Sequence, residues 1–369
     1  MQETVTDRLS LILEDTPLID LRAPVEFAKG APPKAINLPL MTDQERAKVG
    51  TCYKKQGQEA AIELGHRLVS GATKEERLAA WQGVINQHPN AVFYCFRGGL
   101  RSQTVQAWLS DVGIDVPILS GGYKRLRSWL SETLENIIDS RELLVLGGKT
   151  GCAKTELLHD LDPEHCDTIS IDLEGIARHR GSAFGRRVSP QPTQISFEMA
   201  LASAVIKKTH QRSGNLLFED ESKLIGRCGI PPKLYEKMRA APLILIEESV
   251  EFRVEHSFQN YILKNHEEWI TQLVDPDAAF DAFSKSLLRS ADDITKRLGG
   301  ERHKRLRSML SFALQRHASG DPSEHRAWIR MLLTEYYDPM YDYQLSDKAN
   351  RIQFRGNYAE VRAQLLSNA

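Results

Sequence analysis

The segment around Cys95 combines a thiol with glycines and positive charge, and this combination indicates reactive-cysteine chemistry. Cys95 follows the apolar run AVFY and precedes a loop made of Phe96, Arg97, Gly98, Gly99, Leu100 and Arg101. The glycines let backbone N–H groups point inward and the arginines add positive charge, so the loop favours a thiolate. A helix with Ser102 as its expected N-cap adds an N-terminal dipole. A cysteine at a strand end is by itself an ordinary buried residue, but this setting predicts a thiol that can also hold Cys–S–S⁻ or Cys–S–Se⁻.

A phosphate-binding loop is predicted between the apolar run LLVL and a helical pattern. The spacing G-x-x-x-x-A-K-T is formed by Gly148, Lys149, Thr150, Gly151, Cys152, Ala153, Lys154 and Thr155. Backbone amides of residues 149–154 can surround a diphosphate, Lys154 supplies a cation, and Thr155 offers a hydroxyl to Mg²⁺. Ala153 replaces the last glycine of the motif, and a left-handed conformation there would cost about 1 kcal/mol or more. This departure weakens the expectation of tight nucleotide binding more than that of phosphate contact.

An acidic group after the apolar run NLLFE is the expected partner of this loop. It consists of Glu219, Asp220 and Glu221. A carboxylate at the end of a strand beside a P-loop orients metal-bound water, and Asp220 or Glu219 is placed to do this. A solvated acidic turn is the alternative interpretation, so Mg²⁺ is one option and the sequence assigns no metal.

Two basic segments are candidates for contact with phosphate or RNA. The candidate residues are Arg178, His179, Arg180, Arg186 and Arg187 in the first segment, and Arg305 and Arg307 in the second. Arginines among glycines suit phosphate contacts, and the tyrosines of residues 336–344 suit stacking on an unpaired base. A solvated basic face and ordinary helix packing remain alternative explanations.

Strand and helix patterns alternate along most of the chain and predict an α/β fold with parallel sheets. Apolar runs predict strands at 17–21, 91–95 and 116–120, and a second set at 143–146, 167–171, 215–219 and 242–246. A boundary is expected near residue 138, and strand signals vanish after about residue 258. We therefore predict an α/β domain at 1–137, a P-loop α/β domain at 138–257 and a mostly helical C-terminal region at 258–369.

Charge and cysteine usage narrow the class of protein. The 369 residues contain 48 Lys and Arg against 49 Asp and Glu, for a net charge of −1, so a nucleic-acid surface would have to be local. The dispersed cysteines Cys52, Cys95, Cys152, Cys166 and Cys228 fit neither a disulfide framework nor a structural zinc site. No secretion signal and no apolar stretch of about 20 residues is found. We expect a soluble protein of the reducing cytoplasm.

The Cys95 loop and the upstream segment LIDLRAPVEFAKGAPPKAINLPL together resemble the rhodanese fold. The opening motif of that fold is matched by Asp20, Arg22, Glu26, Gly30 and Ala35. The resemblance implies that residues 1–137 form a rhodanese-like domain in which Cys95, at the end of a central strand, carries transferable sulfur. Rhodanese-like domains also occur as inactive modules and as phosphatases, and the C-x5-R spacing from Cys95 to Arg101 leaves a phosphatase open.

A rhodanese-like domain fused to a P-loop domain resembles the bacterial tRNA 2-selenouridine synthase family. Besides the two loops, the matching motifs are VGTCYKKQGQEAAIELGH, SGGYKRLR, DLEGIARHRGSAFG, FEDESKLIG and TEYYDPMY. The resemblance implies conversion of wobble 2-thiouridine to 2-selenouridine in the tRNAs for Lys, Glu and Gln, with selenophosphate as selenium donor. It also implies an S-geranyl-2-thiouridine intermediate made from geranyl diphosphate. The P-loop would then hold the prenyl diphosphate, and the Cys95 loop would handle selenium.

Two other classes of function remain open at the level of sequence. One is a P-loop NTPase or kinase whose rhodanese-like domain is a regulatory module, for which Cys95 would be dispensable. The other is a plain sulfurtransferase that uses thiosulfate and acts without tRNA. The sequence does not decide whether ATP or GTP binds, which residues select the wobble base, or what the oligomeric state is.

Overall fold

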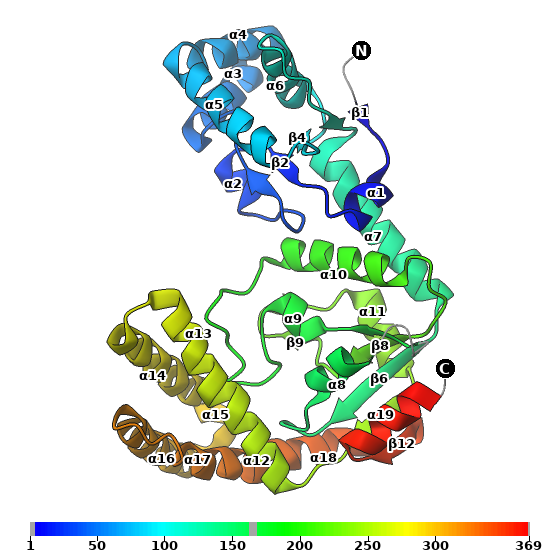
Figure 1. Cartoon of the computed structure of the whole chain (residues 1–369), viewed down its shortest axis with the longest axis vertical. Coiled ribbons are helices and arrows are strands. Elements are labelled where there is room, and N and C mark those ends of the chain that lie inside the picture. Colours follow the sequence, from blue (N-terminus) through cyan, green and yellow to red (C-terminus); the bar gives the residue numbers. More distant parts are fainter. Residues whose placement is uncertain (1–3, 162–167, 368–369) are drawn as a thin grey trace. The chain divides into compact units, whose positions relative to one another are not determined.

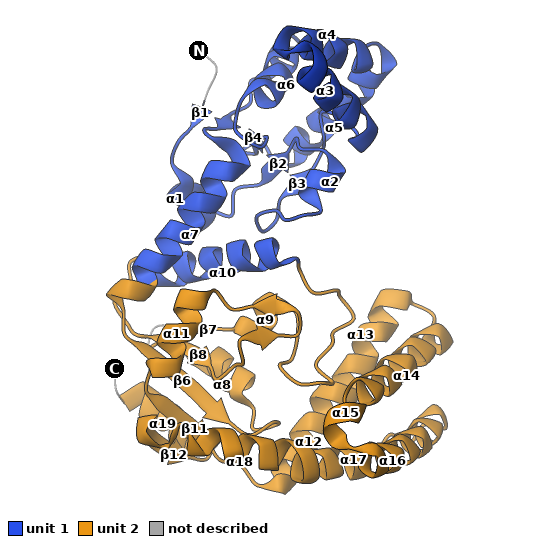
Figure 2. Ribbon diagram, turned by 180° about the vertical axis from the view of Figure 1, so that it is seen from behind, with its two compact units in different colours: residues 1–137, 193–210 blue, residues 138–192, 211–369 orange. Residues whose placement is uncertain are grey.

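The computed structural model describes residues 4–161 and 168–367. The chain divides into two compact units, one of residues 1–137 and 193–210 and the other of residues 138–192 and 211–369 (Figure 2). Each unit contains a five-stranded parallel sheet accompanied by helices. The predicted α/β class is therefore confirmed, and the expected boundary near residue 138 coincides with the division into units.

The sheet of the first unit places β4 at its centre. The strand order is β1-β5-β4-β2-β3, with β1 at Thr4–Val5, β5 at Ile118–Leu119, β4 at Val92–Tyr94, β2 at Leu18–Asp20 and β3 at Ile36–Asn37. The three strands predicted for this region correspond to β2, β4 and β5. The strands β1 and β3 were missed because neither lies within an apolar run, whereas β5, which is equally short, lies within the run VPIL.

Helices surround this sheet and share its core. They are α1 (Arg8–Leu13), α2 (Pro24–Phe27), α3 (Asp43–Gln56), α4 (Gln58–Leu68), α5 (Ala72–Gln87), α6 (Leu100–Ser110), α7 (Gly122–Ser140) and α10 (Gln194–Thr209) (Figure 1). The core below the sheet includes Ile19, Trp81, Phe93 and Leu109, all almost fully buried. Helix α10 belongs to this unit although the P-loop precedes it in the chain: the Ala31 N–H donates to Ser196 Oγ at 3.1 Å.

The predicted start of the helix after the Cys95 loop is wrong by one turn. Helix α6 begins at Leu100 with Gly99 as its N-cap, so Ser102 lies inside the first turn. Its side chain is fully buried rather than capping the helix end. The glycine pair turns the chain into the helix earlier than the serine signal indicated, which frees the Ser102 hydroxyl for another role.

The sheet of the second unit places β6 at its centre, and the P-loop follows this strand (Figure 1). The strand order is β12-β11-β6-β8-β7, with β12 at Ile352–Gly356, β11 at Leu243–Ile246, β6 at Leu143–Gly148, β8 at Leu216–Glu219 and β7 at Ile169–Ile171. A short hairpin joins β9 (Leu224–Ile225) to β10 (Cys228–Gly229). The helices nearest in sequence are α8 (Lys154–Asp160), α9 (Leu173–Ala177), α11 (Pro232–Ala240) and α19 (Tyr358–Ser367).

A helical layer continues the second unit between β11 and β12. It comprises α12 (Val250–Phe258), the π-helix η1 (Gln259–Leu263), α13 (Lys264–Leu273), α14 (Pro276–Asp293), α15 (Thr295–Leu298), α16 (Gly300–Ala318), α17 (His325–Leu332), the π-helix η2 (Leu333–Tyr337), α18 (Asp338–Ser346) and the 3₁₀ turn η3 (Ala349–Arg351). Phe283, Leu306, Leu310 and Trp328 form the buried core of this layer. No helix within the described residues is long and apolar enough to cross a membrane.

The expectation that strands end near residue 258 is wrong. Strand β12 pairs in parallel with β11 through Leu243–Ile352 and Ile246–Gly356, and α19 contributes Val361 and Leu365 to the core of the sheet. Residues 258–369 therefore belong to the same compact unit as the P-loop and form no third unit. The alternation of exposed and half-buried residues in β12 hid this edge strand from an analysis based on apolar runs.

Candidate functional site

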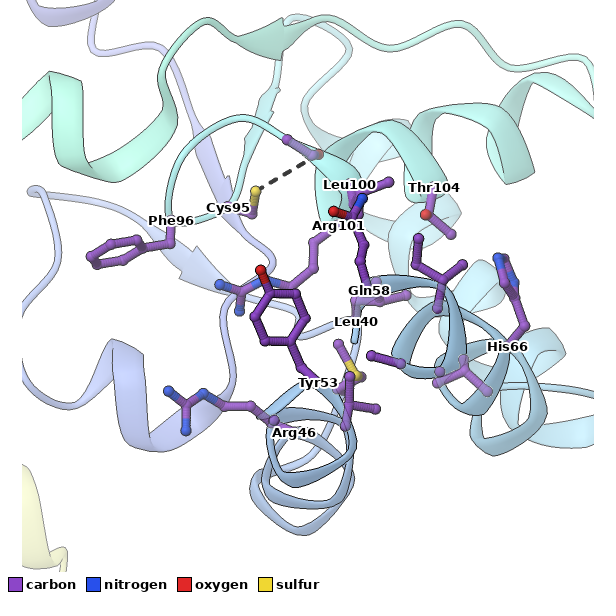
Figure 3. A pocket seen from close by; sticks show the side chains of 18 of the residues that line it. Leu40, Arg46, Tyr53, Gln58, His66, Cys95, Phe96, Leu100, Arg101 and Thr104 are labelled. Carbon is purple, nitrogen blue, oxygen red and sulfur yellow. Dashed lines mark hydrogen bonds between the residues drawn. The ribbon is translucent and has the colours of Figure 1, made fainter. Parts of the chain in front are cut away.

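Cys95 lies directly after the central strand β4 and lines a large cavity of the first unit. Its side chain is 3% exposed, and the cavity has a volume of about 1110 Å³. Figure 3 shows the cavity between the Cys95 loop and the side chains of α3, α4 and α6. The thiol is therefore withdrawn from bulk water but open to a molecule that enters this space.

The loop after Cys95 is held in place by the glycine turn that starts α7. The Tyr123 N–H donates to the Cys95 carbonyl oxygen and the Lys124 N–H to the Phe96 carbonyl oxygen, both at 2.9 Å. A Cβ at Gly122 would overlap the Cys95 carbonyl oxygen, so a side chain at this position would push the two segments apart. The SGGYKRLR segment thus positions the loop, a role that its sequence alone did not reveal.

The environment of Cys95 lowers the pKa of its thiol below the ordinary value. Burial alone raises this pKa, but the Ser102 hydroxyl, the Arg97 N–H and the charge of Arg101 outweigh burial. Within the described residues the buried Ser102 Oγ has no hydrogen-bond partner, so its hydroxyl is available to a Cys95 thiolate. The loop therefore favours the thiolate form of Cys95.

The residues of the opening motif build the scaffold beneath this loop. The guanidinium of Arg22 donates to the Asp20 carboxylate at 2.6 Å, and the Tyr94 hydroxyl donates to the same carboxylate at 2.6 Å. Arg22 also lies 3.7 Å from the centre of the Tyr123 ring, in the segment that holds the loop. Glu26 reaches the cavity itself, because it pairs with Arg101 at 2.7 Å.

The P-loop joins β6 to α8 in the second unit. Ala153 adopts the left-handed conformation, with φ of 62°, at the position where the motif has glycine. Lys154 Nζ donates to the Gly148 carbonyl oxygen at 3.0 Å and so points across the loop. Burial alone lowers the pKa of Lys154, but its neighbours Cys152 and Tyr341 raise it above the ordinary value. A permanent cation therefore lies where a phosphate would enter.

Two of the three predicted acids lie beside this lysine, together with a carboxylate that the sequence analysis missed. The Thr155 hydroxyl donates to Glu219 Oε1 at 2.6 Å, and Glu174 Oε2 lies 3.3 Å from the same hydroxyl. Burial and repulsion by Glu221 raise the pKa of Glu174 to about 8, and burial and repulsion by Glu219 raise that of Glu221 to about 7. Glu174 lies in the segment DLEGIARHR, for which the sequence analysis predicted only the basic residues as candidates.

Asp220 is engaged differently from the other two acids. Lys348, which follows α18, donates to both oxygens of the Asp220 carboxylate, at 2.8 and 2.6 Å. Asp220 therefore links the end of β8 to the segment after α18. Within the described residues no group of three or more His, Cys, Asp or Glu side chains is arranged to hold a metal ion.

Helix α18 contacts the P-loop from the opposite side. Lys149 Nζ donates to Asp342 at 3.0 Å, and the nearly buried Arg253 makes two 2.7 Å hydrogen bonds to Asp338. No local sequence signal marks these pairs, because their members lie 193 and 85 residues apart.

A cavity of about 210 Å³ opens at the P-loop. Its walls include Lys154, Thr155, Glu174, Arg180, Arg187, Glu221, Tyr261, Tyr337 and Tyr341. A smaller apolar pocket shares Thr150, Ser182, Tyr261 and Tyr337 with this cavity and is completed by Phe184, Ser257, Trp328, Ile329, Leu332 and Leu333. The arrangement can hold an anionic group on the loop with an apolar group attached to it.

The predicted basic residues do not gather at one place. Arg180 and Arg187 line the P-loop cavity, whereas Arg178 is exposed and His179 is buried. Burial and the neighbouring arginines lower the pKa of His179 to about 4. Arg180 also pairs with Glu268. The other three are in ion pairs as well, formed by Arg186 with Asp293, Arg305 with Glu335 and Arg307 with Asp292.

The cysteines other than Cys95 show no sign of a shared site. Cys52, Cys95, Cys152 and Cys228 are free thiols, and Cys166 lies outside the described residues. Burial raises the pKa of Cys152 and of Cys228, so their neutral forms are favoured. Cys95 is thus distinguished from these two by a lowered pKa and from all three by its loop.

The two units define a class of protein in which a rhodanese-like domain and a P-loop domain share one chain. Residues 5–128 match the rhodanese-like domain, and residues 141–369 match the tRNA 2-selenouridine synthase AAA domain. Because the second match covers more than half of the chain, the chain belongs to the tRNA 2-selenouridine synthase family. The expected family is therefore confirmed.

Relatives that carry the family name are similar over nearly the whole chain. The tRNA 2-selenouridine synthase of Hahella chejuensis is 52% identical, with 96% of this chain and 92% of the relative covered. The proteins of the same name from Alcanivorax borkumensis and Pseudomonas putida KT2440 are 50% and 49% identical, with 100% of this chain and at least 98% of each relative covered. Both units are thus shared with these relatives.

Proposed function

We propose that the chain replaces sulfur by selenium at carbon 2 of wobble 2-thiouridine, in the tRNAs for Lys, Glu and Gln. One observation carries the proposal: this member of the family has two different loops that stabilise anions. The Cys95 loop favours a thiolate, and the P-loop cavity adjoins an apolar pocket. The first suits chalcogen chemistry and the second suits a diphosphate ester with an apolar chain.

The first step is S-alkylation with geranyl diphosphate. The base sulfur attacks carbon 1 of the geranyl group, the carbon–oxygen bond breaks, and diphosphate leaves with the electron pair while N3 of the base loses its proton. Negative charge grows on the diphosphate as the bond breaks, and Lys154 with the loop amides would stabilise that charge. The apolar pocket lined by Phe184 and Leu332 has a volume of about 30 Å³, so it would contact only part of the geranyl chain.

Mg²⁺ is a possible partner of the diphosphate, because Mg²⁺ binds through one or two protein oxygens together with substrate phosphates. Glu219 Oε2 is buried without a hydrogen-bond partner within the described residues, and the other oxygen of the same carboxylate accepts from Thr155. These two side chains would hold the ion, which would supply positive charge to the leaving diphosphate.

The second step exchanges selenium for the alkylated sulfur. The selenium of selenophosphate attacks carbon 2, and geranyl thiolate leaves and takes the donor's proton to become geranylthiol. Water then cleaves the phosphorus–selenium bond, which yields phosphate and returns a proton to N3. Selenium keeps its oxidation state throughout, so no oxidant or reductant is required. Because the Cys95 loop stabilises anions, we assign the selenium donor to this loop, where Cys95 would position the donor's selenium for its attack on carbon 2.

RNA contacts are proposed for the basic residues of both segments. Since Arg180 and Arg187 line the P-loop cavity, they are suited to bind phosphate near the alkylation step. Arg305 and Arg307 remain candidates on α16, although each faces an acidic partner. Replacing both by alanine should weaken tRNA binding and flatten its salt dependence, because phosphate neutralisation releases counterions.

Two variants separate the steps. Purified protein is incubated with thiolated tRNA and geranyl diphosphate, with or without selenophosphate, and the nucleosides are measured by mass spectrometry. Lys154→Ala should leave 2-thiouridine unmodified, whereas Cys95→Ser should accumulate S-geranyl-2-thiouridine. Lys285→Ala and Cys52→Ser, whose residues line neither cavity, are the matched controls.

Three results would contradict the proposal. Normal S-geranylation by Lys154→Ala would remove the P-loop from this step, and normal 2-selenouridine from Cys95→Ser would remove Cys95 from selenium transfer. Failure of Cys95→Ser to geranylate would show that the two steps share one site. Nucleotide turnover with dispensable Cys95 would favour the NTPase, and thiosulfate activity without tRNA would favour the sulfurtransferase.

A further inference from the structure

The cavity at Cys95 is much larger than an inorganic selenium donor requires. Its volume of about 1110 Å³ lies just above the roughly 300–1,000 Å³ that small-molecule pockets occupy. A selenophosphate ion has five heavy atoms and would fill a small part of it. The remaining space calls for a larger occupant at the moment when Cys95 acts.

Part of the cavity lining is apolar. Its lining includes Leu40, Met41, Val49, Ile62, Leu100 and Trp108. Helix α3 has no buried residue. Its Val49 side chain is half-buried and borders the cavity. When such a wall covers an alkyl chain, the apolar surfaces of both leave water, and this stabilises the complex.

Other residues of the lining suit a nucleotide. Arg97 and Lys54 are exposed at the lining, and Arg101 adds its charge beside the Cys95 loop. Tyr53 projects from α3 toward the Cys95 loop and is 57% exposed, so its ring is available for stacking on a base (Figure 3). A molecule that carries both a nucleotide and an alkyl chain would match both kinds of lining residue.

We infer that this cavity binds the S-alkyl chain of the modified uridine, with Val49 and Ile62 forming the wall that recognises the chain. The inference rests on the proposed function, because it places the S-geranyl base at Cys95 for selenium exchange. Recognition of the chain gives the exchange site a means of selecting alkylated over unalkylated 2-thiouridine. It also holds the geranylthiol leaving group apart from the anionic selenium donor.

The first test compares chain lengths on the wild-type protein. RNA hairpins with S-geranyl- or S-methyl-2-thiouridine at the wobble position are supplied with selenophosphate, and initial rates of 2-selenouridine formation give KM and kcat. Each buried methylene strengthens binding by about fourfold, so burying a few carbons of the longer chain should lower KM by at least about tenfold. The value of kcat should change much less, because the bonds that form and break are the same.

The second test alters the wall. In the double variant Val49→Thr with Ile62→Thr, KM for the S-geranyl hairpin should rise toward that for the S-methyl hairpin, whose own KM should stay near the wild-type value. Val112→Thr is the matched control, since Val112 is 49% exposed and does not line the cavity. Thermal melting of each variant separates loss of recognition from loss of fold.

The possible outcomes discriminate between the inference and the function on which it rests. Equal KM values for the two hairpins on the wild-type protein would overturn chain recognition and leave the proposed function standing. Undiminished preference in the double variant would place the chain elsewhere. Failure of the folded wild-type protein to convert either hairpin would refute the exchange step itself. If the double variant does not fold, the wild-type comparison decides alone.

Discussion

The substitution Ser102→Ala should slow the reaction of Cys95 with an alkylating reagent at neutral pH. The Ser102 hydroxyl is buried and lowers the pKa of the Cys95 thiol through a hydrogen bond. A hydrogen bond to an ionised group contributes about 1.5–3 kcal/mol, and about 1.4 kcal/mol corresponds to a factor of ten. Since the thiolate is the reacting form, the variant should be alkylated about tenfold more slowly or slower still.

Iodoacetamide labelling followed by mass spectrometry of the Cys95 peptide measures this rate as a function of pH. The difference should shrink as pH rises, because the thiol ionises in both proteins under alkaline conditions. Ser110→Ala on the same helix is the control, since Ser110 is exposed and its hydroxyl faces Asp115 at 3.2 Å. An unchanged pH profile for Ser102→Ala, or equal slowing at every pH, would refute the hydrogen-bond argument.

Three further predictions concern the scaffolds of the two loops. Arg22→Met should lower the free energy of unfolding by about 3–5 kcal/mol in urea titrations, because Asp20 stays buried without its partner. Gly122→Ala should lower the melting temperature, because its Cβ would overlap the Cys95 carbonyl oxygen. Glu174 and Glu221 have pKa values of about 8 and 7 and so gain negative charge across this range. Diphosphate binding in metal-free buffer should therefore weaken from pH 6 to pH 9 in calorimetry, and less so in Glu174→Gln.

The parts of the fold that the sequence predicted share a strong local signal. The runs PLIDL, AVFYC and LLVL are apolar and bounded by turn residues, and each corresponds to a buried strand. Strand β12 lacks this signal because it lies at the sheet edge, with exposed and half-buried residues in alternation. The helix start after Cys95 was misplaced because the turn depends on Gly98, whose positive φ and contact with residues 119–122 are tertiary features.

The candidate sites follow the same rule. The Cys95 loop and the P-loop are contiguous motifs, so the sequence alone shows them. Glu174, Arg253 and Lys348 approach the P-loop or its acidic partner from distant segments, and the chain's course in space is needed to find them. For the basic residues, composition does not reveal that Arg186 and Arg305 face acidic partners.

The return of the chain to the first unit at residues 193–210 has a consequence for biosynthesis. Helix α10 supplies Ile195, against which Gly30 packs, and Lys207, which pairs with Asp15. A ribosome adds residues at about 5–20 per second. Helix α10 is therefore synthesised several seconds after the rest of the first unit, because the P-loop segment is made in between. During that interval the surface that α10 will cover is open on the nascent chain, and a chaperone or an incorrect partner has access to it. Folding of the amino-terminal half therefore depends on translation continuing well past its apparent boundary.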